Sequence, residues 1–207
     1  MASVFIRVPL WPKFFLAALG AFGALAVSPA WAQDGSSTLA DKVKAGLLVE
    51  FARYTTWPAD RFDGADAPLV MTVLDDERLA EVLIAFVRSG AVRLHGRPVR
   101  VLRLPRVDPD DEEQVRSFLK SVEQSHLLYI GQSSARRVRE LLRRVEGSTL
   151  LTVSTTPRFA TEGGMIGLFL QENRYRFDIN LNSIERAGLR ISSKVLDLAR
   201  RVIRSDG

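Results

Sequence analysis

The chain has 207 residues, of which 46% are hydrophobic and 26% are charged, and its formal net charge is +5. This composition is ordinary for one globular domain, and so mild a positive excess does not indicate a nucleic-acid partner. The chain has no cysteine, which excludes disulfides, thiol catalysis, iron–sulfur clusters and zinc–thiolate sites.

The first 32 residues have the order of a secretory signal peptide. Arg7 and Lys13 precede an uncharged apolar run over residues 14–27, and Ala30-Trp31-Ala32 supplies the small residues that signal peptidase requires. The run is shorter than the roughly 20 residues that a membrane-spanning helix needs. We therefore expect cleavage near Ala32 and export from the cytoplasm.

Residues 33–37 are expected to form a short flexible lead-in, and residues 38–207 a single domain. Thr38 is a good helix N-cap, and the predicted helix ends near Tyr54. Four apolar side chains recur at every fourth position and predict its core-facing stripe: Leu39, Val43, Leu47 and Phe51.

Trp57 and Pro58 directly follow this predicted helix, in a segment that is unusually apolar for a loop. Two interpretations are open for them. They pack in the core, or they anchor a protein partner, because Trp is enriched in interface hot spots.

Strands and helices then alternate along the chain. Short apolar runs predict strands at residues 69–74, 99–104, 126–130 and 150–153. Helical spacing predicts helices in between, over residues 79–90, 108–122 (with Asp108 as N-cap) and 134–146. This alternation predicts a largely parallel sheet with helices on both faces.

The pattern changes after Pro157. Residues 165–171 and 175–180 read as two strands joined by a short turn, which predicts an antiparallel hairpin. Ser192 or Ser193 is expected to cap a last helix, with apolar residues from Val195 to Ile203. The predicted fold class is therefore α/β: a three-layer mixed sheet, mostly parallel in its first half, with an antiparallel hairpin near the C-terminus and flanking helices.

No catalytic constellation is visible in the sequence. His95 and His126 are the two histidines, and neither has a partner at metal-ligand spacing. No phosphate-binding glycine loop or nucleophile elbow is present either. We expect a non-enzymatic protein with no catalytic residue, no metal and no cofactor.

Three polar segments each allow two interpretations. Asp75-Asp76 ends a strand, where it either caps the next helix or binds a ligand. The arginines of residues 134–146 either form a solvated helix face or meet an acidic partner or membrane. Gly163 and Gly164 supply a tight turn and also suit close approach of backbone N–H groups to a ligand.

One side of the late hairpin is polar. Arg174, Arg176, Asp178 and Asn180 share that side of the second strand, which is either solvated or contacted by a partner. Together with Trp57, Pro58, Gly163 and Gly164, these are the candidate binding residues. As an alternative function, a small-molecule-binding module would have its crevice at the carboxyl ends of the strands, lined by the Asp75-Asp76 and Gly163-Gly164 segments.

Five segments are more specific than these general patterns. In chain order they are Phe51-Ala52-x-Tyr54-x-x-Trp57-Pro58, Gly96-Arg97-Pro98-Val99, Phe159-Ala160-x-x-Gly163-Gly164-Met165-Ile166, Asn173-Arg174-Tyr175-Arg176-Phe177-Asp178-Ile179-Asn180-Leu181 and Ala187-Gly188-Leu189-Arg190-Ile191-Ser192-Ser193-Lys194-Val195-Leu196. Their combination resembles the YfiR family of periplasmic proteins, over essentially the whole exported chain.

The resemblance implies a periplasmic regulator that forms homodimers. Such a protein binds the periplasmic domain of an inner-membrane diguanylate cyclase, or another membrane sensor, and holds it inactive. An OmpA-like outer-membrane lipoprotein (YfiB) releases the cyclase by sequestering the regulator, so that cyclic di-GMP and biofilm increase. Many relatives carry a cysteine where Ser125 stands here, so we expect no redox control.

Overall fold

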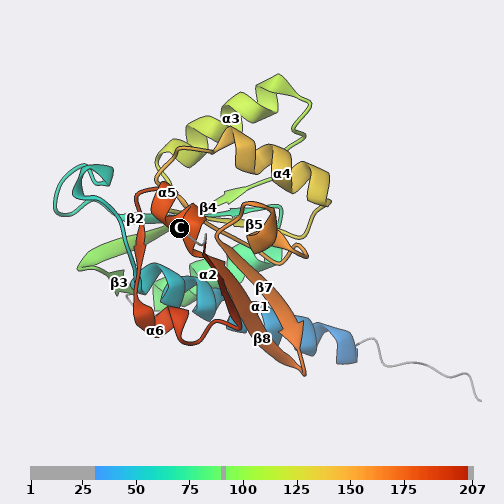
Figure 1. Ribbon diagram of the computed structural model, residues 1–207. Coiled ribbons are helices and arrows are strands. Elements are labelled where there is room, and N and C mark those ends of the chain that lie inside the picture. The colour runs from blue at the N-terminus through green and yellow to red at the C-terminus, as the bar shows by residue number, and fades with distance from the viewer. Residues whose placement is uncertain (1–30, 90–91, 205–207) are drawn as a thin grey trace, which may run out of the picture.

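The computed structural model describes residues 31–89 and 92–204. Residues 1–30, which hold most of the predicted signal peptide, lie outside the described residues. The chain forms an eight-stranded sheet in the order β10-β8-β7-β6-β5-β2-β4-β3, with helices on both faces (Figure 1). The predicted α/β class is confirmed.

The middle of the sheet is parallel, as predicted. It contains β4 (Arg97–Leu104), β2 (Leu69–Leu74), β5 (Leu127–Ile130), β6 (Leu151–Ser154) and β7 (Ile166–Gln171). All residues of β2, β5 and β6 are buried, which explains their continuous apolar runs. The antiparallel pairs lie toward the edges of the sheet.

The predicted hairpin is present, because β7 pairs antiparallel with β8 (Arg174–Asn180). At the other edge β3 (Arg93–Leu94) pairs antiparallel with β4. A separate two-stranded sheet joins β1 (Thr55–Thr56) to β9 (Arg190–Ile191). Because β1 directly follows α1, this small sheet joins the C-terminal end of α1 to the segment after α5 (Leu181–Arg186).

Two hydrophobic clusters lie on opposite faces of the sheet. One packs under α1 (Trp31–Arg53) and α2 (Glu77–Ser89), and the other under α3 (Glu112–Glu123) and α4 (Ala135–Arg144). Strand β5 contributes Leu127 and Tyr129 to the first cluster and Leu128 and Ile130 to the second. This division follows from the alternation of side chains along a strand.

The start and the core face of α1 differ from the prediction. The helix begins at Trp31, so residues 33–37 and the predicted N-cap Thr38 lie within it. Leu39 and Val43 are 64% and 42% exposed, while the buried side is that of Ala45, Leu48 and Ala52. The predicted stripe therefore holds only in its second half, where Phe51 is buried in the core cluster and Leu47 packs against it.

The predicted last helix begins where expected but is much shorter than predicted. Ser192 caps α6 (Ser193–Leu196), which ends after one turn, and β10 (Arg201–Ile203) then pairs parallel with β8. The Arg200 N–H donates to the Phe177 carbonyl at 2.9 Å. Strand β8 would otherwise be an unpaired edge, and satisfying its backbone groups outweighs the helical spacing of the apolar residues.

A smaller difference concerns the start of α3. Its N-cap is Asp111, whose side chain accepts hydrogen bonds from the N–H groups of Glu113 and Gln114. The predicted cap, Asp108, instead accepts from the Asp110 N–H at 3.1 Å in the preceding turn. Aspartate is favoured at N-cap positions, so the local sequence does not show which of these two aspartates caps α3.

Candidate functional site

Trp57 is a core residue. Its side chain is part of the cluster under α1 and is 6% exposed. The indole N–H donates to the His126 carbonyl at 3.0 Å, and the ring lies edge-on to His95 and His126. Of the two interpretations, the structure supports core packing for Trp57, while Pro58 is half-buried.

His126 is held neutral inside the fold. Its Nδ1 accepts the Val70 N–H at 3.1 Å, its Nε2 lies 3.2 Å from the Arg61 carbonyl, and Phe62 stacks on the ring at 4.4 Å. Burial lowers the pKa of His126 to about 4, and the nearby charges of Arg61 and Arg97 act in the same direction. This histidine therefore serves the structure, as does His95, whose Nε2 lies 3.0 Å from the Ala52 carbonyl.

Gly163 and Gly164 have different structural roles. Gly163 ends the short η2 helix (Phe159–Glu162) with φ of 101°, a left-handed conformation that favours glycine. A Cβ on Gly164 would lie 2.2 Å from the Phe159 ring, so no side chain fits there. The turn interpretation accounts for both residues.

The four polar hairpin residues divide into two pairs. Asp178 and Asn180 are buried and bonded within the chain, whereas Arg174 and Arg176 are exposed. Within residues 31–89 and 92–204, neither guanidinium forms a side-chain hydrogen bond or an ion pair. Only this second pair is available to a partner.

The buried pair connects β8 to its surroundings. Asp178 forms ion pairs with Arg200 at 2.5 Å and Arg201 at 2.9 Å. Burial alone would raise the pKa of Asp178, but the hydrogen bonds from these arginines hold it below its usual value. Asn180 donates to the Ala160 carbonyl at 2.8 Å and caps α5 by accepting the Ser183 N–H at 3.0 Å.

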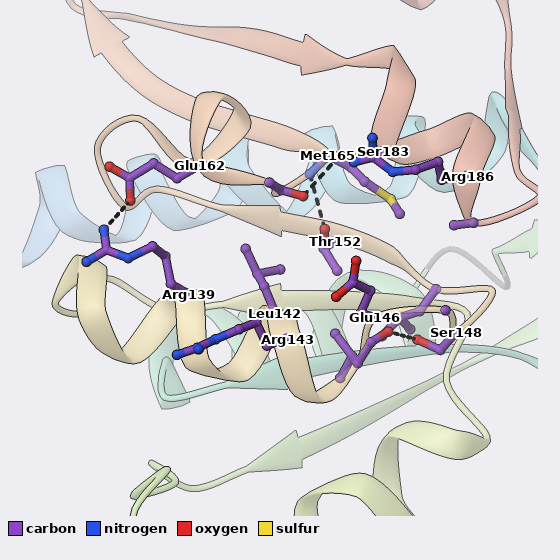
Figure 2. Close-up of a pocket in the computed structure, with 15 residues that line it drawn as sticks. Arg139, Leu142, Arg143, Glu146, Ser148, Thr152, Glu162, Met165, Ser183 and Arg186 are labelled. Carbon is purple, nitrogen blue, oxygen red and sulfur yellow. Dashed lines mark hydrogen bonds and ion pairs between the residues drawn. The ribbon is translucent and has the colours of Figure 1, made fainter.

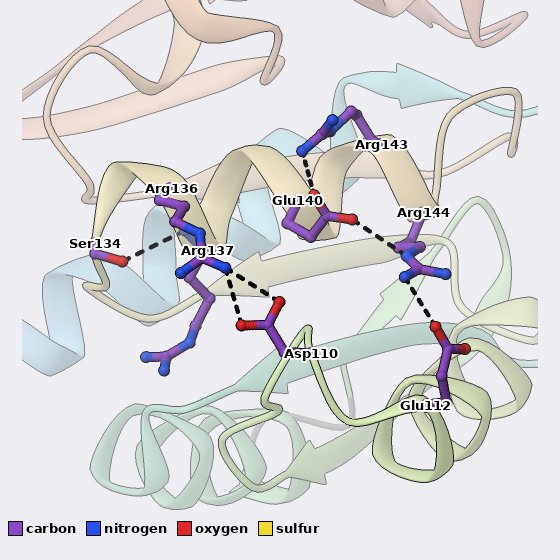
Figure 3. Close-up of polar contacts among 8 residues, drawn as sticks. All are labelled: Asp110, Glu112, Ser134, Arg136, Arg137, Glu140, Arg143 and Arg144. Carbon is purple, nitrogen blue, oxygen red and sulfur yellow. Dashed lines mark hydrogen bonds and ion pairs between the residues drawn. The ribbon is translucent and has the colours of Figure 1, made fainter.

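The arginine-rich face of α4 is mostly paired with acidic residues of this chain (Figure 3). Arg136 contacts Asp110 at 2.9 Å, and Arg144 contacts both Glu112 and Glu140. Arg143 also pairs with Glu140, and Arg139 pairs with Glu162. These contacts favour the solvated-face interpretation, and exposed pairs of this kind contribute little to stability.

Asp75-Asp76 and Gly163-Gly164 do not line one crevice, so that prediction is wrong. Asp76 lies at the carboxyl end of β2, where its Oδ1 accepts the Leu79 N–H at 3.1 Å and caps α2. Gly164 instead precedes Met165, whose N–H donates to Thr152 near the start of β6. Because β2 and β6 run in the same direction, the two segments lie toward opposite ends of the sheet.

A crevice of about 720 Å³ lies between α4, β6 and α5 (Figure 2). This volume is within the range of roughly 300–1,000 Å³ that is typical of small-molecule sites. An ion pair between Arg139 and Glu162 at 2.8 Å lies at one end, and Arg186 lies at the other. Five apolar residues line the crevice: Leu142, Val145, Leu150, Met165 and Ala187.

Of the candidate binding residues, only Gly163 lines this crevice, together with Arg139 and Arg143 from the arginine-rich helix. Sequence reasoning missed Arg186, whose guanidinium donates to the Ser183 hydroxyl at 3.1 Å, and it missed Thr152. No local motif marks these residues, because α4, β6 and α5 come together only in the folded chain.

The described residues offer neither a metal site nor a membrane span. They contain no group of histidine, aspartate or glutamate that could hold a metal ion. No helix in the same part of the chain is long and apolar enough to cross a membrane.

In a comparison with known protein families, a model described as YfiR/HmsC-like matches residues 41–200.

Proposed function

The chain belongs to the YfiR/HmsC-like family, and on that premise we propose that it represses an inner-membrane diguanylate cyclase by binding the cyclase's periplasmic domain. Repression keeps cyclic di-GMP low in the cytoplasm and limits biofilm formation. The observation that carries this proposal is the family match over residues 41–200. In this proposal the protein is non-enzymatic, and an OmpA-like outer-membrane lipoprotein relieves the repression.

Such a regulator works by differential binding. A protein in the periplasm does not contact cytoplasmic cyclic di-GMP, so its influence passes through a membrane-spanning partner. It shifts that partner toward the inactive state only by the difference between its affinities for the two states. Coupling free energies of about 1–3 kcal/mol are typical of such systems.

The exposed end of the β7–β8 hairpin is the contact surface that we assign to the cyclase. Arg174 and Arg176 lie on one face of it without a side-chain hydrogen bond or ion pair in the described chain, and Leu170 is 62% exposed on the opposite face. Leu170 pairs with Tyr175 across the two strands. Arginine and tyrosine are enriched at protein interfaces, which supports this assignment.

The first experiment is deletion of the gene followed by measurement of cyclic di-GMP and biofilm. Both should rise, and a plasmid copy of the gene should restore them. Unchanged cyclic di-GMP in the deletion strain would contradict the proposed function.

A second experiment tests the surface. Arg176→Glu should fail to restore repression in the deletion strain, because it reverses a charge on the contact surface. Arg78→Glu is the matched control, since Arg78 is an exposed residue of α2 and its change in charge is the same. Equal repression by both variants at equal protein levels would exclude the hairpin as the contact.

The crevice supports a second candidate function, a periplasmic small-molecule-binding module. Its volume of about 720 Å³ and the Arg186 side chain at one end suit a small ligand with a polar group. Thermal-shift screening against periplasmic metabolites tests this function, because a ligand that binds the folded state raises the unfolding temperature. A compound that binds in the crevice should no longer raise the unfolding temperature of the Arg186→Met variant. A screen in which no compound raises the unfolding temperature of the wild type would count against this function.

A further inference from the structure

Strand β4 has one paired side and one largely open side. On its inner side it pairs in parallel with β2 over residues 99–104. On its outer side β3 reaches only Arg97 and Pro98, because β3 has two residues. From Val99 onward, the outer side of β4 is therefore an edge of the eight-stranded sheet within the described residues. Figure 1 shows this edge on the side of the sheet away from the β7–β8 hairpin.

The backbone groups at this edge belong to every second residue of β4. The Leu104 carbonyl accepts the Asp75 N–H at 3.1 Å, so the backbone groups of Leu104 point toward β2. Successive residues of a strand point their backbone groups to opposite sides. Those of Leu102 therefore also point toward β2, whereas those of Val101 and Arg103 point outward. A row of unpaired N–H and C=O groups is a template for pairing with another extended chain.

The apolar side chains beside this edge are only partly covered. Val99 and Val101 pack against the cluster under α1 and α2 and are half-buried. Their partners in β2, Leu69 and Met71, are fully buried. The difference arises because β2 has a strand on each side and β4 does not. An added strand would cover the remaining apolar surface, since cross-strand side-chain pairs stabilise a sheet.

The first half of this edge carries positive charge that no carboxylate balances. Three arginines beside it form no ion pair within residues 31–89 and 92–204: Arg93, Arg97 and Arg100. Their guanidinium groups donate to uncharged acceptors, which are backbone carbonyls and one amide oxygen. In the second half, by contrast, Arg103 pairs with Glu77 at 2.6 Å. Charge complementarity therefore favours a partner with acidic side chains opposite the first half.

The same charge argues against a second copy of this chain at the edge. Two β4 strands paired edge to edge would bring the arginines of both copies together. Like charges directly opposite each other destabilise a strand pair. An acidic segment has the opposite charge and meets no such repulsion.

We propose that the free edge of β4 binds an extended, acidic polypeptide segment of another protein, which adds to the sheet as a further strand. In this mode main-chain hydrogen bonds, here to Val101 and Arg103, give affinity, and side-chain contacts give specificity. Strands β6, β5 and β2 separate this edge from the β7–β8 hairpin, so both surfaces can be occupied at once. The inference rests on β4 and goes beyond the regulatory function, on which it does not depend.

Fluorescence anisotropy of the exported protein with a labelled synthetic peptide tests the charge. The peptide alternates glutamate and valine and is as long as β4. The same peptide with lysine in place of glutamate should bind at least about tenfold more weakly. Arg100→Glu should raise the dissociation constant of the acidic peptide at least about fivefold, because it reverses an unbalanced charge. Arg190→Glu is the matched control and should leave it unchanged, since Arg190 is exposed on the separate small sheet.

Amide hydrogen exchange followed by NMR tests the backbone contact. The N–H groups of Val101 and Arg103 should exchange rapidly in the free protein. With the acidic peptide at about ten times its dissociation constant, their exchange should slow about tenfold. The N–H of Leu102 should not change, because it points toward β2 in both states. A merely electrostatic contact with the arginines would not protect alternate residues in this way.

Val101→Pro removes one outward N–H and no hydrogen bond to β2. Proline is tolerated on an edge strand where its N–H side faces solvent, and circular dichroism checks that the variant folds. It should bind the acidic peptide at least about fivefold more weakly. Arg100→Glu and the exchange measurement test the same edge without altering the backbone.

The proposal would be overturned by a wild-type protein that binds the acidic peptide no better than the basic one. An acidic peptide that binds without slowing exchange at Val101 and Arg103 would place the contact elsewhere. Unchanged affinity in Arg100→Glu, or in a folded Val101→Pro variant, would likewise exclude this edge.

Discussion

The two halves of β8 have the same alternation of polar and apolar residues but opposite environments. In the first half, Arg174 and Arg176 are exposed. In the second half, Asp178 and Asn180 are 6% and 8% exposed and bonded within the chain. The difference follows from β10, which pairs with residues 178–180 only. An alternating pattern thus identifies the polar side of a strand but not whether that side faces solvent.

The largest expected effect is at Asn180. Asn180→Ala removes the N-cap of α5 and leaves the Ala160 carbonyl without its donor. The loss of a cap and of a buried hydrogen bond should lower the free energy of unfolding by about 2 kcal/mol. Urea denaturation followed by circular dichroism measures this free energy. A loss close to zero would show that the second half of β8 contributes no more to stability than the first half.

Asp178→Ala should have the next largest effect. Breaking a fully buried ion pair costs about 3–5 kcal/mol, but the side chains of Arg200 and Arg201 are 47% and 54% exposed. Solvent can hydrate these arginines once Asp178 is gone, so we expect a loss of about 1–2 kcal/mol. The same denaturation experiment measures it, and the expected order is Asn180→Ala first and Asp178→Ala second.

The contribution of Asp178 should also depend on pH. Its pKa lies below the ordinary value of 3.8, so the folded state binds this proton less readily than the unfolded state does. The carboxylate therefore stabilises the fold above about pH 4, and the contribution is lost as pH falls through the lowered pKa. The difference in unfolding free energy between wild type and Asp178→Asn should shrink between about pH 5 and pH 2. A difference that stays constant would contradict the ion-pair explanation.

The smallest effect on stability should come from the first half of β8. Arg174→Ala and Arg176→Ala remove no side-chain hydrogen bond or ion pair within the described chain, so each should change the free energy of unfolding by less than about 0.5 kcal/mol. Their effect should appear in repression of the cyclase. A loss above 1 kcal/mol in either variant would show that the open half of β8 is also structural.

Much of the fold could be predicted because its signals are local. The apolar run of β2 matches residues 69–74, since a strand buried on both faces contains few polar residues. The β7–β8 hairpin could be recognised from alternation and a short turn. Whether Trp57 packs in the core or contacts a partner could not be predicted, because its indole N–H donates to a carbonyl that lies 69 residues away in the chain.

The candidate sites were less predictable than the fold. Glycine spacing indicated the turn at Gly163, but Arg186 and Thr152 reach the same crevice from α5 and β6. Leu39 and Val43 of α1 have the same four-residue spacing as Leu47 and Phe51, so all four were assigned to the core, but Leu39 and Val43 are exposed. Periodicity shows that a helix has an apolar face and cannot show which of two faces packs inward.

The sequence by itself determined the alternation of strands and helices, the hairpin and the family, because these depend on neighbouring residues and on short motifs. Tertiary structure decided which polar residues of β8 face inward, which side of α1 is free, and that residues 201–203 form a strand. These outcomes depend on contacts between segments far apart in the chain. Burial and backbone pairing are settled only when those segments come together.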